Sequence, residues 1–234
     1  EIRLSLVGSE MCIRDSVNSK QRRVPVSLDA PVFTLTHAMG FKGVLGGEYN
    51  FNRTEASIWK RFWLPASWGK IDCSVKAGAE WNTVPFPLLI LPEANLSYIT
   101  QRETFCLINN MEFLNDRFAS MSISYDMNGK LFNRIPLLKN LKWREMFRIR
   151  ALWGTLTDKN NPFKSSNPDL FRFPTRDGKF TSFVMDPKVP DVEASVFIYN
   201  IFKLLHVEYV HRFTYRDNPG INKNGIRFMV LMVF

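Results

Sequence analysis

Apolar and polar residues alternate with a period of two in many segments of this chain, and this pattern limits the fold more than any other feature. In "KIDCSVKAGAEWN" (70–82), every second residue is apolar and most of the residues between them are charged or polar. Successive side chains of an extended strand point to opposite faces, whereas an amphipathic helix needs apolar residues at i, i+3 and i+4. The alternation recurs in "FASMSISYDMN" (118–128), "WREMFRIRALW" (143–153) and "LLHVEYVHRFTYRD" (204–217). The chain is therefore predicted to be all-β.

The alternating segments follow one another at the spacing of hairpins. Turn residues separate them, as in "MNGK" and "RDNPGINKNG". We expect an antiparallel meander of about eight to nine long strands, near residues 32–40, 50–64, 69–82, 103–115, 117–128, 143–156, 192–202, 204–216 and 224–234. Residues 157–191 have no such pattern and are predicted to form a long loop.

Alternation does not say which face of the sheet is buried. In a soluble sandwich or lipocalin-like barrel the apolar face points inward, whereas in an outer-membrane β-barrel it faces lipid and the charged face lines the lumen. No run of about 18 apolar residues is present, so no transmembrane helix is expected. Several predicted strands reach the roughly 9–11 residues that a tilted membrane span needs. This length favours an outer-membrane barrel.

Aromatic residues support the membrane interpretation. They make up 14% of the chain, and many stand near the ends of predicted strands, where amphipathic rings would form an interfacial girdle. The girdle is predicted to include Trp81, Trp143, Trp153, Tyr209 and Tyr215.

The last predicted strand, "NGIRFMVLMVF", has a phenylalanine as its final residue. Five apolar residues share one face of it and together are typical of an outer-membrane assembly signal: Ile226, Phe228, Val230, Met232 and Phe234. We expect barrel-assembly machinery to read Phe234, so that its deletion impairs insertion.

Charged residues on the opposite faces are predicted to line the lumen, because a Lys or Arg in mid-bilayer costs about 2–4 kcal/mol. Glu193 lies on the strand that precedes Glu208, which suggests a ladder of ion pairs with Arg212. The predicted lumen-facing charges are Arg144, Arg148, Arg150, Glu208 and Arg212.

Motifs for catalysis, metals and nucleotides are not found. His206 and His211 differ in parity and point to opposite faces of one strand, and Cys12, Cys73 and Cys106 form no CxxC pair. "GFKGVLGG" (40–47) lacks the spacing of a phosphate-binding loop, and there is no GxSxG. We expect no enzyme activity, no cofactor and no metal.

The net charge of +9 would suit nucleic acid or acidic lipid headgroups. The basic residues are dispersed among aromatics and acids, and Pro136 interrupts the most basic segment, so nucleic acid is not expected as a partner. Lys139 and Lys142 could instead meet acidic headgroups at a membrane rim.

The first residues differ from the rest. "SLVGSEMCIRDS" closely resembles a translated sequencing-library adapter, which implies that residues 1–16 are not native. Residues 17–234 would then be the C-terminal section of a transmembrane β-barrel, whose partners are outer-membrane lipid and the missing N-terminal part of the same chain.

Three segments (113–145, 152–162 and 191–234) resemble the C-terminal barrel of an uncharacterised outer-membrane family of Gram-negative bacteria. Its members place a carboxypeptidase-regulatory-like domain before a barrel similar to that of TonB-dependent receptors. "VPFPLLILP" (84–92) resembles the proline-rich connector of that family, and the whole resemblance spans residues 24–234. Phe197 and Tyr199 depart from it, since relatives tend to have a glycine and an acid there. The resemblance implies location in the bacterial outer membrane but no particular substrate.

The leading hypothesis is a non-enzymatic outer-membrane barrel with a transport, receptor or envelope-structural role. A protein-translocating or barrel-assembly barrel is an alternative, although the VRGF-like motif usual in that group is not present. An enzyme built in a barrel would need a nucleophile and a base on one face. A soluble lipid-binding barrel would extract without detergent.

Overall fold

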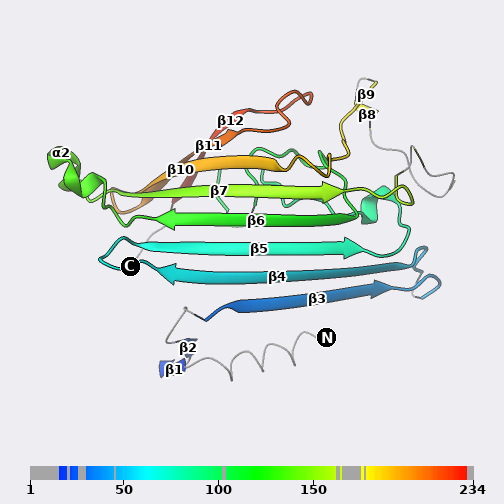
Figure 1. Cartoon of the computed structure of the whole chain (residues 1–234), viewed down its shortest axis with the longest axis horizontal. Coiled ribbons are helices and arrows are strands. Elements are labelled where there is room, and N and C mark those ends of the chain that lie inside the picture. Colours follow the sequence, from blue (N-terminus) through cyan, green and yellow to red (C-terminus); the bar gives the residue numbers. More distant parts are fainter. Residues whose placement is uncertain are drawn as a thin grey trace.

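The fold is an eight-stranded antiparallel sheet whose strands follow one another in sequence order (Figure 1). The computed structural model describes residues 16–19, 22–25, 30–44, 46–101, 104–161, 164, 175–176 and 178–230. The order of the strands in the large sheet is β12-β11-β10-β7-β6-β5-β4-β3. Each strand pairs with the strand of this sheet that precedes it in the chain and with the one that follows it. The predicted all-β antiparallel meander is confirmed. Within the described residues the sheet is open, with β3 and β12 as its two edges.

The strands of the sheet are long where the alternation is long. Their bounds are Val32–Gly40 (β3), Phe51–Trp63 (β4), Lys70–Glu80 (β5), Arg117–Asp126 (β6), Arg144–Thr155 (β7), Asp191–Ile201 (β10), Leu205–Arg212 (β11) and Asn224–Val230 (β12).

The other elements are short. Two two-stranded ladders stand apart from the sheet: Ser16–Ser19 (β1) with Arg22–Pro25 (β2), and Thr175–Arg176 (β8) with Lys179–Phe180 (β9). The helical elements within the described residues are two 3-10 turns and one four-residue helix: Phe86–Leu88 (η1), Phe132–Arg134 (η2) and Pro136–Lys139 (α2). Among the described residues, no helix has the length and apolar character needed to cross a membrane. In the predicted loop 157–191, the described part contains only β8, β9 and the first residue of β10.

The strand expected near 103–115 was a wrong prediction. In residues 104–115 the structure has only isolated bridges, such as Phe113 with Phe183. The backbone of this segment bonds to side chains instead of a neighbouring strand: the N–H groups of Cys106 and Leu107 donate to the Glu193 carboxylate, and the carbonyl of Cys106 accepts from Arg227.

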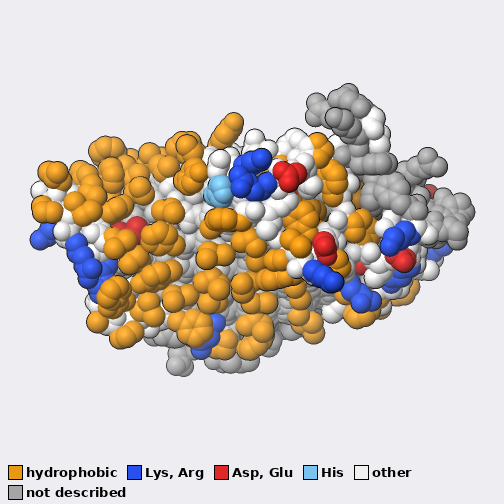
Figure 2. Space-filling view, turned by 45° about the horizontal axis from the view of Figure 1, so that its top comes forward, with side chains coloured by type: hydrophobic (Ala, Val, Ile, Leu, Met, Phe, Trp, Pro, Cys, Tyr) orange, Lys and Arg blue, Asp and Glu red, His pale blue; other side chains and the backbone are white. Residues whose placement is uncertain are grey.

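The two faces of the sheet have opposite chemistry. The face called apolar here carries exposed large side chains on strand after strand: Phe33, Leu35, Ile58, Phe62, Val75, Phe147, Ile149, Trp153, Val196, Tyr209, Ile226, Phe228 and Val230. Figure 2 shows hydrophobic side chains over most of the surface in view, with charged side chains in small groups. The other face, called polar here, carries charges and hydroxyls such as Lys76, Ser122, Arg150 and Glu193, which the strand registers place on one side.

The core of the molecule lies over the polar face. The connector of β5 and β6, residues 81–116, folds back across this face and supplies most of the buried apolar side chains, including Phe105, Ile108 and Phe113. They pack on apolar residues of the polar face, including Leu152 of β7 and Val210 of β11. We call residues 81–116 the docked connector.

The sheet curls around its polar face. One cavity is lined both by Trp59 of β4 and by Met229 of β12, which are six strand spacings apart in the sheet. In a flat sheet those two strands would lie about 29 Å from each other, because neighbouring strands are about 4.8 Å apart. Both can line one cavity of about 560 Å³ only if the polar face is concave.

Candidate functional site

The candidate site is the polar face with its docked connector, and Glu193 is central to it. The Glu193 carboxylate accepts hydrogen bonds from the backbone N–H groups of Cys106 (2.9 Å) and Leu107 (3.1 Å). The same carboxylate pairs with Arg150 of β7 at 2.9 Å, and neither side chain is more than 2% exposed. A buried charge is tolerated when it is both paired and hydrogen-bonded. Here the carboxylate ties the connector to two strands at once.

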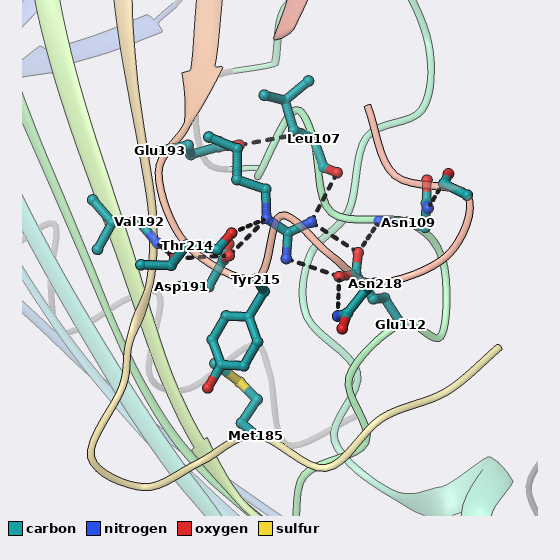
Figure 3. A network of polar contacts seen from close by, with 12 residues as sticks. Leu107, Asn109, Glu112, Met185, Asp191, Val192, Glu193, Thr214, Tyr215 and Asn218 are labelled. Atoms are coloured by element: carbon teal, nitrogen blue, oxygen red, sulfur yellow. Dashed lines mark hydrogen bonds and ion pairs between the residues drawn. The ribbon is translucent and has the colours of Figure 1, made fainter. Parts of the chain in front are cut away.

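Arg212, the last residue of β11, makes a second attachment, and Figure 3 shows the polar network that includes its partners Asp191 and Glu112. Its Nε donates to Asp191 at 2.7 Å, and its two terminal nitrogens donate to the carboxylate of Glu112 at 3.0 and 2.8 Å. The guanidinium also lies 5.5 Å from the centre of the Phe113 ring. A two-pronged arginine–carboxylate pair fixes orientation as well as distance. Residues 112–113 of the connector are therefore held in one arrangement.

Further polar contacts extend along the connector. Thr100 donates to Glu208 at 3.0 Å, and Arg227 of β12 donates to the carbonyl of Cys106. Lys76 of β5 forms an ion pair with Glu93. At residues 98–100, backbone hydrogen bonds join the connector to Phe228 at the edge strand β12. Strands β5, β7, β10, β11 and β12 thus hold the connector through charged or backbone groups, as does β4, where Arg53 donates to the carbonyl of Leu88 at 2.5 Å.

Cys106 lies at the centre of these contacts and is fully buried. Burial raises the pKa of its thiol to about 11, although the nearby Arg150 guanidinium opposes that shift. The thiol is therefore protonated at neutral pH and is a weak nucleophile. Within the described parts of the chain, no cluster of three or more His, Cys, Asp or Glu side chains could hold a metal ion.

The connector leaves part of the polar face open as the cavity of about 560 Å³. Its floor contains four serines on neighbouring strands, Ser74, Ser120, Ser122 and Ser124, and Ser74 pairs directly with Ser122. Small hydroxyl side chains leave room and can both donate and accept hydrogen bonds.

The charges around the floor are largely paired with one another. Arg61 holds Asp72 through two hydrogen bonds of 2.6 and 2.9 Å, and Lys70 lies 3.7 Å from Asp126. Apolar side chains, including Trp59, Phe105 and Phe197, also line the cavity, so it suits a molecule that has both polar and apolar parts.

Four of the five predicted lumen charges are buried on the polar face: Arg148, Arg150, Glu208 and Arg212. The fifth, Arg144, begins β7 on the same side but is exposed. The sharing of one face is confirmed, whereas the existence of a lumen stays a prediction.

A ladder of ion pairs among Glu193, Glu208 and Arg212 was predicted, and this pairing was wrong. Although Glu193 stands opposite Arg212 in the register, Arg212 turns to Asp191 and Glu112, and both glutamates face Arg150 instead.

The predicted girdle aromatics occupy different environments. Trp81, Trp153 and Tyr209 are exposed, and Trp143 is half-buried at the start of β7. Tyr215 was wrongly assigned to the apolar face. Because β11 ends at Arg212, the chain turns and the Tyr215 ring packs edge-on against Phe113, while its hydroxyl donates to the carbonyl of Val189.

The last strand agrees with its expected alternation as far as it is described. Ile226, Phe228 and Val230 are exposed on the apolar face, whereas Arg227 points to the polar face and is buried. Met232 and Phe234 lie outside the described residues, as do residues 1–15, the bulk of the segment predicted not to be native.

Sequence reasoning missed the connector's part in the site. Glu112, Asp191 and Arg227 were not singled out, and neither was Glu145. Glu145 shares the side of the apolar residues of β7, yet it is buried because it accepts a hydrogen bond from the backbone of Leu131. The signal for Glu112 was available in "NNMEFLND", where an acid stands among apolar residues and so requires a partner.

These features define a class: an all-β protein whose sheet buries a charged face beneath a long connector and leaves an apolar face exposed. The chain belongs to a family of unknown function, DUF5686, whose C-terminal domain model matches residues 14–163. The match covers β1 to β7 and the docked connector. No similar protein was found among curated proteins, and none among solved structures.

Proposed function

We propose that this chain forms the wall of an outer-membrane β-barrel, with the apolar face in lipid and the polar face lining the interior. The observation that carries the proposal is the inverted polarity of the sheet. Buried ion pairs and the docked connector occupy the concave polar face, and exposed hydrophobic side chains cover the other face. A lumen that is polar and a surface that is apolar are the defining contrast of membrane barrels.

Exposure of the apolar face would be unfavourable in water. Monomeric soluble proteins rarely expose contiguous apolar patches of more than a few hundred Å². Here exposed large apolar side chains occur on seven of the eight strands of the sheet, all except β6. Strands β4, β5, β7 and β10 have 13, 11, 12 and 11 residues, which meets the roughly 9–11 residues of a tilted span. Lipid is the surrounding in which these side chains are stable.

The interior favours a transport or receptor role over a purely structural one. A connector held by ion pairs narrows the interior, and the serine-floored cavity beside it has the size of a ligand site. The resemblance of the sequence to barrels similar to TonB-dependent receptors agrees with this role. A purely envelope-structural role would give no reason for a cavity of this size.

The two faces can be tested with neighbouring residues of β5. Val75 lies on the apolar face and Ser74 lines the cavity. A spin label attached at V75C therefore faces away from the cavity, and one attached at S74C faces into it. Both are made in a chain whose native cysteines are replaced by alanine, and both are reconstituted into phospholipid vesicles. Power-saturation spectroscopy should find the label at 75 accessible to oxygen dissolved in lipid and the label at 74 accessible to a water-soluble nickel chelate. Equal access of the chelate to both positions would refute the membrane wall.

The alternative of a soluble lipid-binding barrel requires the apolar face to be concave. The cavity lies on the polar face instead, which weighs against that alternative. Extraction of the chain from membranes by buffer alone, without detergent, would instead support the soluble lipid-binding barrel. A protein-translocating or barrel-assembly barrel would have the same wall, but the VRGF-like motif usual in that group is not present in the sequence.

A further inference from the structure

Three connections meet at one end of the sheet and form a surface that we call the basic rim. They are the β4–β5 turn (64–69), the β6–β7 connection (127–143) and the β10–β11 turn (202–204). Figure 1 shows α2, which belongs to the second of them, at this end of the sheet. The three segments contain five cations and no acid: Lys130, Arg134, Lys139, Lys142 and Lys203.

The cations of the basic rim are available to a ligand. Four of them, Arg134, Lys139, Lys142 and Lys203, are exposed and form no ion pair with any residue in the described part of the chain. Their positive charge therefore extends into the surroundings without an internal counterion.

Large apolar side chains stand among these cations. Leu137 is 83% exposed and Phe202 is 79% exposed, and Leu131, Ile135 and Leu141 are also exposed. Exposed apolar side chains on polar turns contribute little to stability when water surrounds them. A mixture of exposed leucines with lysines and arginines is the composition of segments that lie in a membrane interface.

Trp68 adds an aromatic ring at the same end. The Lys130 ammonium lies 3.7 Å from the ring centre and the Arg134 guanidinium 6.0 Å from it. Tryptophan is enriched at the headgroup level of membranes, where its ring is partly in hydrocarbon and partly in water. Trp68 thus marks the depth at which headgroups would lie.

The three connections form one continuous surface. Lys130 donates to the carbonyl of Ala66 at 3.0 Å, which joins the β6–β7 connection to the β4–β5 turn. Asn200, at the end of β10, donates to the carbonyl of Lys142 at 2.8 Å. These two hydrogen bonds tie the β6–β7 connection to the β4–β5 turn on one side and to the end of β10 on the other.

The opposite end of the sheet differs. Its connections carry acids as well as bases, including Glu48, Glu93, Asp158 and Asp217. Their charges of both signs offset one another over short distances. Among the connections between strands of the sheet, the unbalanced positive charge therefore lies at the basic rim.

We propose that the basic rim binds the phosphate-bearing headgroups of anionic lipids at the edge of the bilayer. This inference rests on the proposed membrane function, because the apolar face would set the position of the rim at the lipid–water boundary. The exposed leucines enter the boundary region while the lysines and arginines contact phosphate oxygens. Juxtamembrane basic residues are attracted to anionic surfaces over about one Debye length.

The test uses the full chain and two kinds of vesicle: phosphatidylcholine alone, and equal parts phosphatidylcholine and phosphatidylglycerol. Association is measured by co-flotation over a range of lipid concentrations. We expect about tenfold stronger association with the vesicles that contain phosphatidylglycerol, and we expect added salt to reduce the difference.

Matched variants locate the effect. The rim variant carries R134Q, K139Q, K142Q and K203Q, and leaves Lys130 in place because it joins two connections. The control variant removes the same number of exposed charges at the opposite end, with K42Q, K188Q, R216Q and K223Q. We expect the preference for phosphatidylglycerol to fall to about twofold in the rim variant and to persist in the control.

Each other result overturns a different claim. Equal association of the unmodified chain with both vesicles, or equal loss of preference in both variants, refutes the basic rim and leaves the membrane wall intact. Failure to associate with either kind of vesicle refutes the membrane wall itself.

Discussion

The two faces of the sheet differ in which side chains are buried. On the apolar face, Phe33 is 65% exposed and Leu35 is 71% exposed, whereas on the polar face Glu208 and Arg212 are completely buried. In a water-soluble sheet the burial would be the other way round, because transfer of apolar surface out of water drives folding and burial of charge opposes it. The contrast indicates that the polar face is stabilised by specific pairing and that the apolar face depends on its surroundings.

The two faces therefore respond to different changes. The polar face should be sensitive to loss of a single partner, because each buried charge depends on a few contacts. The apolar face should tolerate exchange among hydrophobic residues but not the arrival of charge. Each prediction below alters one face and uses the other, or a neighbouring position, as its reference.

The largest effect is expected when Glu193 loses its charge. In E193A, Arg150 and the backbone N–H groups of Cys106 and Leu107 lose their acceptor inside a buried site. Removal of one partner from a buried ion pair costs about 3–5 kcal/mol, because the other charge stays buried. The free energy of unfolding in detergent, measured with urea, should fall by this amount, and protease should cleave the connector more readily.

Ser195 provides the control for that substitution. It lies two residues further along β10, on the same face and equally buried, but its hydroxyl makes no hydrogen bond among the described residues. S195A should change the free energy of unfolding by less than about 1 kcal/mol. Equal effects of E193A and S195A would contradict the importance of pairing on the polar face.

The next largest effect is expected from a charge on the apolar face. Ile149 is 51% exposed near the middle of β7. If this face is in lipid, I149R should reduce the free energy of unfolding in vesicles by about 2–4 kcal/mol. If the face is in water, an exposed substitution should change it by no more than about 0.5 kcal/mol. N133R, in the basic rim, introduces the same charge at the end of the sheet and should be nearly neutral.

A smaller effect is expected from close packing between strand and connector. A methyl group on Gly154 would come within 2.5 Å of the side-chain atoms of Asn115, which is buried. Overpacking of this kind costs about 1–3 kcal/mol, so G154A should lower stability by that amount. At Gly225 the nearest atom is the end of the flexible Leu107 side chain at 2.9 Å, so G225A should have a smaller effect. The urea midpoints of G154A and G225A, each compared with that of the unmodified chain, measure the two effects.

The strands were predictable because their signal is local. Val32–Gly40 was expected at the same bounds, and the expected bounds of β4 and β5 differ from the structure by one or two residues. Period-two alternation needs no knowledge of the rest of the chain. The identity of the buried face was not predictable from it, since an alternating pattern reads the same whichever face is buried.

The docked connector and the pairs it forms lay beyond sequence reasoning. Burial of residues 105–108 depends on the polar face below them, so the local sequence carries no period that reports it. Arg212 was assigned to a glutamate directly across the strand, but it turned to Glu112, one hundred residues away in the chain. Long-range charge pairing depends on how loops return to the sheet, and register alone does not determine it.

The smallest effect concerns the reactivity of two cysteines on the two faces. In a C12S chain, Cys73 lies half-exposed on the apolar face, while Cys106 is fully buried beneath the connector and burial raises the pKa of its thiol from 9.0 to about 11. A maleimide that dissolves in lipid should reach Cys73 and label it slowly at pH 7.5, because few thiols ionise in lipid, whereas Cys106 should stay unlabelled until the connector is released, as in E193A. The raised pKa of the Cys106 thiol also predicts the direction in which stability changes with pH. Below pH 9 both folded and unfolded chains keep the Cys106 proton, but between pH 9 and 11 the unfolded chain releases it first, so the folded state becomes less stable as pH rises through this window. C106A should remove that part of the pH dependence, whereas C73A should leave it. Fast labelling of Cys106 in the unmodified fold would mean that the connector opens freely and that the polar face is not closed by its ion pairs.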